Sequence, residues 1–278
     1  MKLGSIVAAA AFVAALGACK PSRSNTAETP AAPTIVSVTA NEYAFQAPDT
    51  IPAGNITIRL HNAGQQIHHM QIVRLDSGKT LADFQAAMHN PGPPPGWTHM
   101  VGGPNASVPG DSTEATVRLA AGSYVMLCMI PGPDGQPHVM KGMMRALQVG
   151  PATTAAPRPV ADVVATLSDY DFQFSTPITA GRRTIEVVNS GPQPHEMVVA
   201  QLAPGKTAQQ LFAWADGGMH GPPPGRPIGG ATGLEPGARS LVAITFTPGE
   251  YALICFFPDA KDGRPHGAHG MVKQFTVS

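Results

Sequence analysis

The chain has 278 residues, of which 43% are hydrophobic and only 13% are charged. This length suffices for two ordinary domain cores of roughly 100 to 150 residues each. The 18 Lys and Arg residues balance 18 Asp and Glu residues, so the formal net charge is zero. Because a nucleic-acid surface needs a basic excess or patch, the composition predicts no nucleic-acid partner. The 30 Gly and 29 Pro residues stand mainly in short clusters between apolar runs, which is typical of an all-β protein.

The N-terminus carries the pattern of an export signal. A positive Met1-Lys2 pair precedes an apolar stretch, 6–16, that is too short to span a bilayer comfortably. The stretch ends in Leu16-Gly17-Ala18-Cys19, which resembles the lipobox of bacterial lipoproteins. The resemblance implies a signal peptide over 1–18 and lipidation of Cys19, and hence an exported, membrane-anchored lipoprotein that faces the periplasm or the cell exterior. An ordinary secretory signal cleaved nearby is the alternative, and it also implies export.

The remainder of the chain is a tandem repeat behind a short leader. Residues 19–33 are rich in Ser, Thr, Ala and Pro and lack apolar periodicity, which predicts a disordered tether. Two similar segments follow at an offset of 127 residues. We expect them to form domains over 34–149 and 160–278, joined by a linker at 150–159 that is rich in Thr, Ala and Pro.

Each repeat opens with short alternating or apolar runs separated by Pro and Gly, as expected of successive strands in a β-sandwich. One short helix follows in each repeat, because Thr80-Leu-Ala-Asp83 and Thr207-Ala-Gln-Gln210 both match the capping-box pattern. A tight hairpin then leads into the strand that ends at a cysteine. The expected strands are 34–39, 43–45, 51–60 and 145–149 in the first repeat and 170–172, 178–187 and 273–277 in the second. The hairpins span 116–128 and 243–255, with turns at 121–122 and 248–249.

The most informative stretch follows that cysteine. A thiolate, an imidazole and a thioether stand in this order on one loop, and these are soft and borderline ligands that hold copper. The two loops carry Cys128, His138 and Met143 in the first repeat and Cys255, His266 and Met271 in the second. The cysteine-to-histidine separations are ten and eleven residues, and both loops contain the same H-x4-M spacing.

A further histidine ligand is expected upstream of each loop. At the offset of 127 residues, His68 matches His195, whereas His69 matches Glu196. Strand periodicity places His68 on the same face as the apolar Met70, while His69 points to the other face. We therefore take His68 and His195 as the upstream ligands.

Each repeat resembles a cupredoxin, the family of plastocyanin, azurin and the copper nitrite reductases, and the resemblance covers nearly all of the chain after the leader. It implies an all-β fold of two tandem Greek-key cupredoxin-like β-sandwiches, each with one short inserted helix. It also implies one type 1 (blue) copper ion per domain and a one-electron carrier. The implied copper ligands are His68, Cys128, His138, Met143, His195, Cys255, His266 and Met271.

Other choices of ligand stay open at the edges of this set. His269 competes with His266, but its counterpart in the first repeat is Lys141. Met140 and Met144 compete with Met143 without sharing its spacing.

A disulfide is the usual expectation for two cysteines of an exported protein. Against a bond between Cys128 and Cys255, the two residues occupy equivalent places in the two repeats. A metal-free sandwich that keeps these side chains as core and loop filler is a further alternative.

A protein that sequesters or delivers copper is the main alternative to an electron carrier. Ten histidines and twelve methionines, including the run His68-His69-Met70, suit the capture of Cu(I). The redox partner protein is not named by the sequence, and the membrane is a partner only through the lipid on Cys19.

The sequence argues against an enzyme. Copper nitrite reductases and multicopper oxidases place a histidine beside the type 1 cysteine to reach a catalytic copper. The residues beside Cys128 and Cys255 are Leu127, Met129, Ile254 and Phe256. We therefore expect no enzymatic activity, with a catalytic copper built from His69, His89 and His99 as the alternative.

A Met-His pair stands before a proline run in both repeats, as Met88-His89 and Met219-His220. The pairs could form a second, weaker copper site. The simpler interpretation is that Met88 completes the apolar stripe of the helix and His89 caps its C-terminus.

Overall fold

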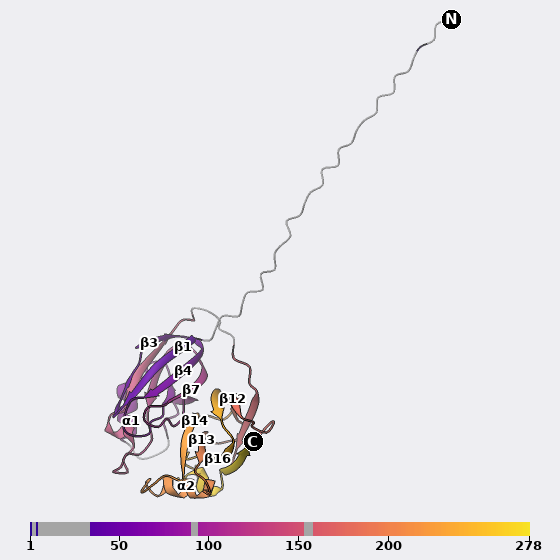
Figure 1. The fold of residues 1–278 in the computed structure, drawn as a ribbon. Helices are drawn as coiled ribbons and strands as arrows, with labels where there is room; N and C mark the ends of the chain where they lie inside the picture. Colours follow the sequence, from indigo (N-terminus) through magenta and orange to yellow (C-terminus); the bar gives the residue numbers. More distant parts are fainter. Residues whose placement is uncertain (2–3, 5–33, 90–93, 153–157) are drawn as a thin grey trace. The chain divides into compact units, whose positions relative to one another are not determined.

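The computed structural model describes residues 1, 4, 34–89, 94–152 and 158–278 (Figure 1). The predicted signal peptide, Cys19 and the tether lie almost entirely outside the described residues, as does the middle of the predicted linker. Both repeats belong to one unit, Ala31–Ser278. Among the described residues, no helix has the length and apolar character needed to cross a membrane.

The described part of the second unit is nearly all β, with two short α-helices. The first repeat contains β1 (Thr34–Asn41), β2 (Ala44–Gln46), β3 (Thr50–Pro52), β4 (Gly54–Asn62), β5 (Gln71–Leu75), α1 (Leu81–Met88), β6 (Thr98–Gly102), β7 (Ser112–Leu119), β8 (Gly122–Leu127) and β9 (Met144–Gly150). The second contains β10 (Val163–Ser168), β11 (Asp171–Phe174), β12 (Gly181–Asn189), β13 (His195–Leu202), α2 (Ala208–Asp216), β14 (Gly225–Leu234), β15 (Arg239–Phe246), β16 (Gly249–Ile254) and β17 (Val272–Val277). The prediction of an all-β fold with one helix in each repeat is confirmed.

The strands form two sheets that both continue from one repeat into the other. One sheet has the order β11-β10-β12-β15-β7-β4-β1-β2, and the other has the order β17-β16-β13-β14-β6-β5-β8-β9-β3. Figure 1 shows β1, β4 and β7 side by side, and they pair as β10, β12 and β15 do in the second repeat. The junctions are β15 with β7 and β14 with β6. The sequence does not predict these junctions, and the division into domains at 150–159 stays a prediction.

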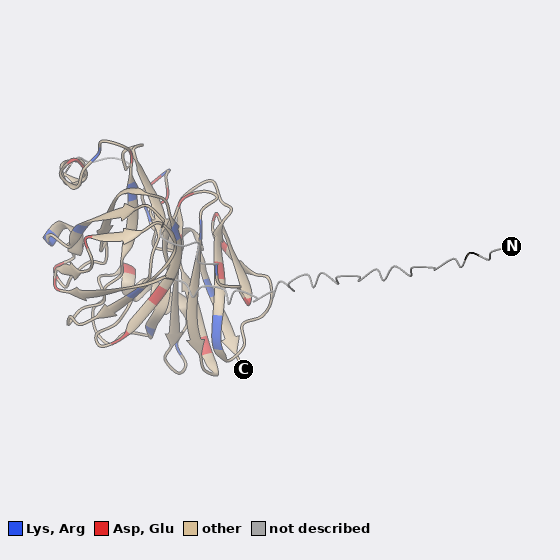
Figure 2. Cartoon of the chain, turned by 90° about the horizontal axis from the view of Figure 1, so that it is seen from above, with Lys and Arg blue, Asp and Glu red and all other residues tan. Residues whose placement is uncertain are grey.

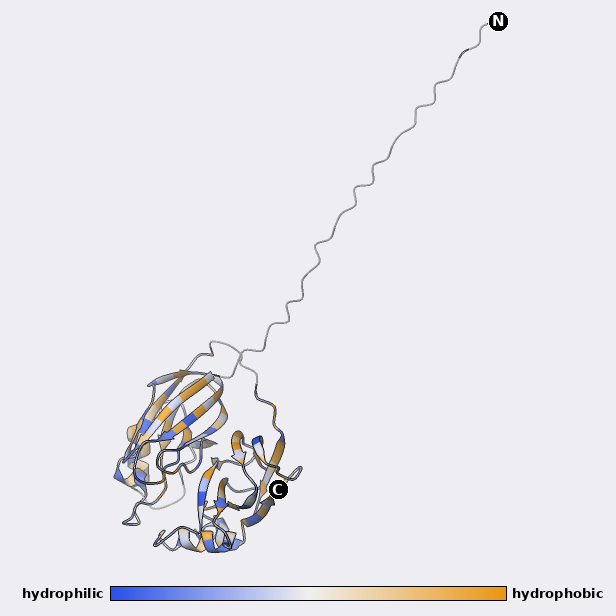
Figure 3. Cartoon of the chain, in the orientation of Figure 1, coloured by the Kyte–Doolittle hydropathy of each residue, from blue (hydrophilic) through white to orange (hydrophobic). Residues whose placement is uncertain are grey.

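Alternation of side chains explains the sandwich. In β1, Val36, Val38 and Ala40 are buried while Ser37 between them is exposed. The same alternation appears as orange and blue bands along the strands in Figure 3. A strand turns successive side chains to opposite faces, so each sheet presents one apolar face to the core. The charged residues are scattered over strands and loops in Figure 2, with long uncharged stretches between them.

The two helices begin where the capping boxes predict. Thr80 accepts a hydrogen bond from the Asp83 backbone N–H, and Asp83 accepts one from the Thr80 N–H. Thr207 and Gln210 form the same reciprocal pair at the start of α2. Because each box satisfies N–H groups that have no partner within the helix, the predicted start of both helices is confirmed.

Two glycines lie where the repeats meet, and each packs against the backbone of its own repeat. Gly103 and Gly230, 127 residues apart, have φ angles of +148° and +124°. A Cβ at either position would collide with the backbone carbonyl of Met70 or Met197. Two hydrogen bonds join the repeats here, from the Asn105 N–H to the Gly230 carbonyl and from the Thr232 N–H to the Gly103 carbonyl, at 3.1 and 3.0 Å. Only glycine has both the conformational freedom and the small size to lie beside the Met70 and Met197 carbonyls of its own repeat.

Candidate metal centre

Site 1 consists of His68, Cys128 and His138, whose ligand atoms all lie within 4.8 Å of one another. Nδ1 of His138 lies 3.1 Å from Nδ1 of His68 and 3.5 Å from Sγ of Cys128. All three residues are 0% exposed. His68 precedes β5 and bridges to Ser107, Cys128 follows β8, and His138 opens the short 3-10 helix η1 (His138–Lys141).

Site 2 consists of His195, Cys255 and His266, and it repeats this arrangement. Nδ1 of His195 lies 2.9 Å from Nδ1 of His266, and Sγ of Cys255 lies 3.5 Å from Nδ1 of His266 and 4.0 Å from Nδ1 of His195. His195 opens β13, Cys255 follows β16, and His266 opens η2 (His266–His269). The structure therefore brings together six of the eight residues predicted as ligands, three in each site.

A carboxylate contacts the ring nitrogen of each upstream histidine that points away from the site. Nε2 of His68 lies 3.2 Å from Oε1 of Glu42, and Nε2 of His195 lies 2.7 Å from Oδ1 of Asp169. An ionised carboxylate only accepts hydrogen bonds, so Nε2 carries the proton and Nδ1 turns a lone pair toward the site. Such partners behind a ligand histidine set its tautomer and orientation in metal sites.

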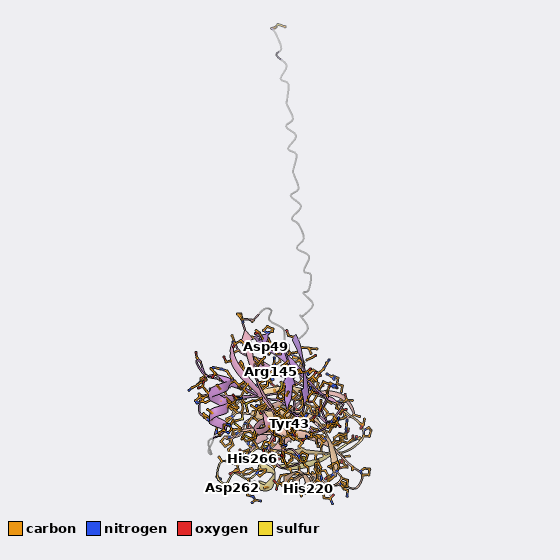
Figure 4. The ribbon with its side chains drawn as sticks, turned by 90° about the vertical axis from the view of Figure 1, so that its left-hand side faces the viewer. Tyr43, Asp49, Arg145, His220, Asp262 and His266 are labelled. Carbon is orange, nitrogen blue, oxygen red and sulfur yellow. The ribbon has the colours of Figure 1, made fainter. Side chains whose placement is uncertain are left out.

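The downstream histidines differ between the sites. Nε2 of His138 lies 3.0 Å from Oε1 of Gln66. Nε2 of His266 has no hydrogen-bond partner and lies 3.8 Å from Oδ2 of the buried Asp259. The rings of Tyr43 and Tyr170 pack against His138 and His266 at centroid distances of 5.0 and 5.5 Å, and Figure 4 labels Tyr43 and His266.

The imidazoles are neutral at neutral pH, which is the form that binds metal. Burial lowers the pKa of His68 and His195 from the usual value of 6.5, although each gains a carboxylate partner. Burial, and then the neighbouring histidine, lowers the pKa of His138 and of His266 to about 4. Each site therefore presents uncharged nitrogen donors.

Both cysteines are free and buried, so the predicted absence of a disulfide between them is confirmed. Burial raises the pKa of the Cys128 thiol to about 12, and burial also raises the pKa of the Cys255 thiol. The backbone N–H groups of His69 and Glu196 donate to the two sulfurs at 3.5 and 3.4 Å. Because a metal cation replaces the thiol proton, these sulfurs are suited to metal binding and unreactive as free thiols.

The donor set fits copper. In site 1 the Nδ1 lone pairs of His68 and His138 face each other across 3.1 Å, which is unfavourable unless a cation or a proton lies between them. Bond lengths of about 2.0 to 2.3 Å, taken from zinc sites, put the ligand atoms of a trigonal site about 3.5 Å apart. The separations of 3.1 and 3.5 Å in site 1 lie close to this. Two imidazoles with a thiolate form a copper donor set, so each site can bind a copper ion.

Met143 and Met271 lie beside the cysteines. Both are 0% exposed, and each belongs to the same hydrophobic cluster as its cysteine. The N–H groups of Cys128 and Cys255 donate to the carbonyls of Met143 and Met271, each at 3.2 Å. This places the methionine backbone next to each site, while the role of the thioethers as ligands stays a prediction.

The competing residues lie elsewhere. Met140 is 46% exposed, and Met144 packs in a different cluster from Cys128. His269 bonds to Asp262 at 3.2 Å and belongs to a third, partly exposed group of candidate ligands with Asp259 and Asp262. Figure 4 labels Asp262 together with His266.

The alternative catalytic copper is not assembled within the described part of the chain. There, the groups of three or more candidate ligands include none of His69, His89, His99 and His220. His99 instead bonds to Asp76 at 3.0 Å, and His89 occupies the C-cap of α1, as its simpler interpretation predicts.

His69 and Glu196, which follow the upstream ligands, are also buried, each at 8% exposure. Burial lowers the pKa of His69 to about 4 and raises that of Glu196 to about 7. Glu196 contacts Asn105 of the other repeat at 3.0 Å. Periodicity predicts faces, but it does not predict that a second repeat covers one of them.

Glu42 and Asp169 were missed by sequence reasoning. They are 127 residues apart, as the ligand pairs are, and each directly precedes the tyrosine that packs on its site. An acidic residue kept at this offset was the available signal. The sequence carried no such signal for Asn105, because its counterpart at the same offset is Thr232.

Comparison with known proteins gives matches among solved structures alone. No family model matches the chain, and no curated protein matches it. Auracyanin from Roseiflexus castenholzii is 26% identical, with a TM-score of 0.30, over 44% of this chain and 100% of its own. Auracyanin A from Chloroflexus aurantiacus is 23% identical, with a TM-score of 0.31, over 42% of this chain and 99% of its own. The copper-containing nitrite reductase of Thermus scotoductus is 13% identical, with a TM-score of 0.24, over 88% of this chain and 61% of its own.

None of these TM-scores reaches 0.5, so the likeness by itself decides no activity. The chain's own β-sandwich, with a His-Cys-His site in each repeat, is cupredoxin-like. The expectation that the protein is not an enzyme is overturned, because the matches include a nitrite reductase, a blue copper oxidase and two multicopper oxidases, over 84 to 88% of this chain. The absence of a histidine beside Cys128 and Cys255 therefore does not exclude an enzyme.

Proposed function

We propose that this protein binds one copper ion in each of its two sites, both of the type 1 kind, and that it carries single electrons. The observation that supports this most directly is the convergence of two imidazole nitrogens and a cysteine sulfur, found twice in one chain. Copper held by this donor set cycles between Cu(I) and Cu(II). Met143 and Met271 are the proposed weak axial ligands.

The protein contributes rigidity and exclusion of water. In site 1, Glu42 and Gln66 orient the two imidazoles, and the His69 N–H donates to the sulfur. The His68, Cys128 and His138 side chains are fully buried, so their positions depend little on the oxidation state of the metal. A site that neither oxidation state distorts favours rapid electron transfer.

Burial also bears on the alternative function, a copper sequestration or delivery protein. His68, Cys128 and His138 are each 0% exposed, as are their counterparts in site 2. An acceptor protein would have to reach a metal through the covering loops, which favours retention of copper over its transfer. A metal-free binding module is the remaining alternative.

The setting of the molecule forms part of the proposal. We infer two tandem Greek-key domains over 34–149 and 160–278, joined by the linker at 150–159. We further infer export under the signal peptide 1–18 and anchoring through a lipid on Cys19, facing the periplasm or the cell exterior. Electrons would pass to and from redox partner proteins.

A visible absorption spectrum of the Cu(II)-loaded protein tests the proposal. A strong thiolate-to-copper band near roughly 600 nm is expected. Cys128→Ser and Cys255→Ser should each remove about half of the band, because each leaves one trigonal thiolate site. His269→Ala is the control, since this exposed histidine at the end of η2 is not among the candidate ligands of either site, and it should leave the band unchanged.

Each contrary result has a definite meaning. The absence of the band in the folded, copper-loaded wild type would reject type 1 copper and leave Cu(I) handling or a metal-free module. Removal of the whole band by one cysteine substitution would reject the second site. Rapid loss of copper to a chelator of protein-like affinity would favour delivery over electron transfer.

A further inference from the structure

A continuous chain of contacts runs from the sulfur of site 1 to the sulfur of site 2 through the boundary between the repeats. It passes through His69, Asn105 and Glu196, all of them buried and none of them a predicted ligand. His69 and Glu196 are the residues that directly follow the upstream ligands, and they match each other at the offset of 127 residues. The chain of contacts has the same design at both ends.

The site 1 end uses both the backbone and the ring of His69. Its N–H donates to Sγ of Cys128 at 3.5 Å, and its Nε2 accepts the Met129 N–H at 2.8 Å. Because Nε2 accepts, the ring proton is on Nδ1. The Asn105 side chain lies next to the His69 ring, where Nδ1–H is the ring's remaining donor.

The site 2 end repeats these contacts with a different side chain. The Glu196 N–H donates to Sγ of Cys255 at 3.4 Å, and its Oε1 accepts the Phe256 N–H at 3.1 Å. Phe256 follows Cys255 as Met129 follows Cys128. Oε2 of Glu196 is therefore available to accept a hydrogen bond from the other repeat.

Asn105 joins the two ends and has one possible orientation. Its Nδ2 donates to Oε2 of Glu196 and to the Ala231 carbonyl, both at 3.0 Å. Its Oδ1 accepts the Ala106 N–H at 2.8 Å and is the acceptor available to the His69 ring. Exchanging the amide oxygen and nitrogen would break each of these bonds, so the bridge is fixed.

We propose that His69, Asn105 and Glu196 form a bridge through which site 1 and site 2 exchange an electron within one molecule. This rests on the proposed function, since it requires copper in both sites. One electron moves: the donor site goes from Cu(I) to Cu(II) as the acceptor site goes from Cu(II) to Cu(I). No bond breaks, no proton moves, and no outside reagent is consumed. The bridge makes the two sites one redox unit, so an electron accepted at either site can leave from the other.

The test is NMR of the half-reduced, copper-loaded protein with labelled methionine methyl groups. Met70 and Met143 share a hydrophobic cluster with Cys128, and Met197 and Met271 share one with Cys255, so each site has its own resonances. Exchange between Cu(I) and Cu(II) broadens these resonances. The exchange rate extrapolated to zero protein concentration is the intramolecular rate.

Asn105→Leu removes the centre of the bridge at similar volume. Thr232→Val is the matched control, because Thr232 occupies the equivalent position, is equally buried, and donates to the Met70 carbonyl at 3.4 Å off the bridge. Glu196→Gln is a second variant that keeps an acceptor for Phe256 but presents an amide N–H to the Asn105 Nδ2. The visible band of each variant shows independently that both sites are loaded.

We expect Asn105→Leu and Glu196→Gln to lose most of the intramolecular exchange rate with both bands retained, and Thr232→Val to keep it. A wild-type rate in either bridge variant would overturn the proposal, as would an equal loss in Thr232→Val, which would mean that the repeats merely need to be in contact. The absence of the visible band from the wild type would instead reject the proposed function, so the two failures are distinguishable.

Discussion

Replacing Glu42 by Gln should weaken metal binding at site 1 and leave site 2 unchanged. The Glu42 carboxylate accepts from Nε2 of His68 at 3.2 Å and from the backbone N–H groups of Gln65 and Gln66 at 2.6 and 2.8 Å. The amide keeps an oxygen for the backbone donors but loses the negative charge behind the imidazole. His68 then becomes a weaker and less firmly oriented donor.

The size of the effect follows from this geometry. Removing the partner behind a ligand histidine typically costs 10- to 100-fold in metal affinity, or about 1.4 to 2.8 kcal/mol. The Glu42 side chain is 24% exposed and its contact with His68 is 3.2 Å, which favours the lower end. Asp169 lies closer to its histidine, at 2.7 Å and 23% exposure, so Asp169→Asn should cost more at site 2.

The assay is a competition titration with a Cu(I) chelator in backgrounds that hold one site. Glu42→Gln is measured in a Cys255→Ser background, in which only site 1 binds metal. Asp169→Asn is measured in a Cys128→Ser background, in which only site 2 binds metal. Glu250→Gln serves as a surface control. An affinity of Glu42→Gln at site 1 within a factor of two of its background would refute the reasoning, provided that the variant is folded.

Three further predictions concern stability, measured by urea denaturation. Thr80→Ala should cost about 1 kcal/mol, because it removes one half of the capping box of α1 without touching either site; an unchanged midpoint would mean that the box contributes nothing. Gly103→Ala should cost about 3 kcal/mol or more, because its Cβ meets the Met70 carbonyl at a positive φ, and a neutral result would contradict the close approach of residue 103 to the Met70 backbone. Phe172→Ala should cost about 3 to 5 kcal/mol and shift a single transition, because both sheets continue across the repeats; a separate transition of the first repeat would show that they unfold independently.

Much of the site could be predicted because its elements are local and occur twice. Cys128 and His138 are ten residues apart on one loop, so their meeting requires only that the loop turn back, as the η1 turn does. The capping boxes around Thr80 and Thr207 act within one helical turn and were correct for the same reason. The repeat supplied the choice of His68 over His69, because only one of them has a histidine counterpart.

Contacts between distant segments could not be predicted in this way. Glu42 is 26 residues from His68, and Asn105 is 91 residues from Glu196. Nothing in an acidic or amide residue specifies which strand will lie next to it, since hydrogen-bond partners depend on the final pairing of the sheets. The sequence of each strand predicts which of its faces is apolar and which is polar. It does not predict whether the outer face is exposed to water or covered by the other repeat.

By itself, the sequence determined the class of the molecule: an all-β tandem repeat in which each copy carries a thiolate, imidazoles and a thioether at a common spacing. Composition, periodicity and ligand chemistry suffice for that, because they act over a few residues. Only the tertiary structure decided that both sheets run through the two repeats and that His69, Asn105 and Glu196 meet between the sites. The physical reason is that each buried contact and hydrogen bond at that boundary needs two surfaces from distant segments. Those surfaces come together only when the chain has folded.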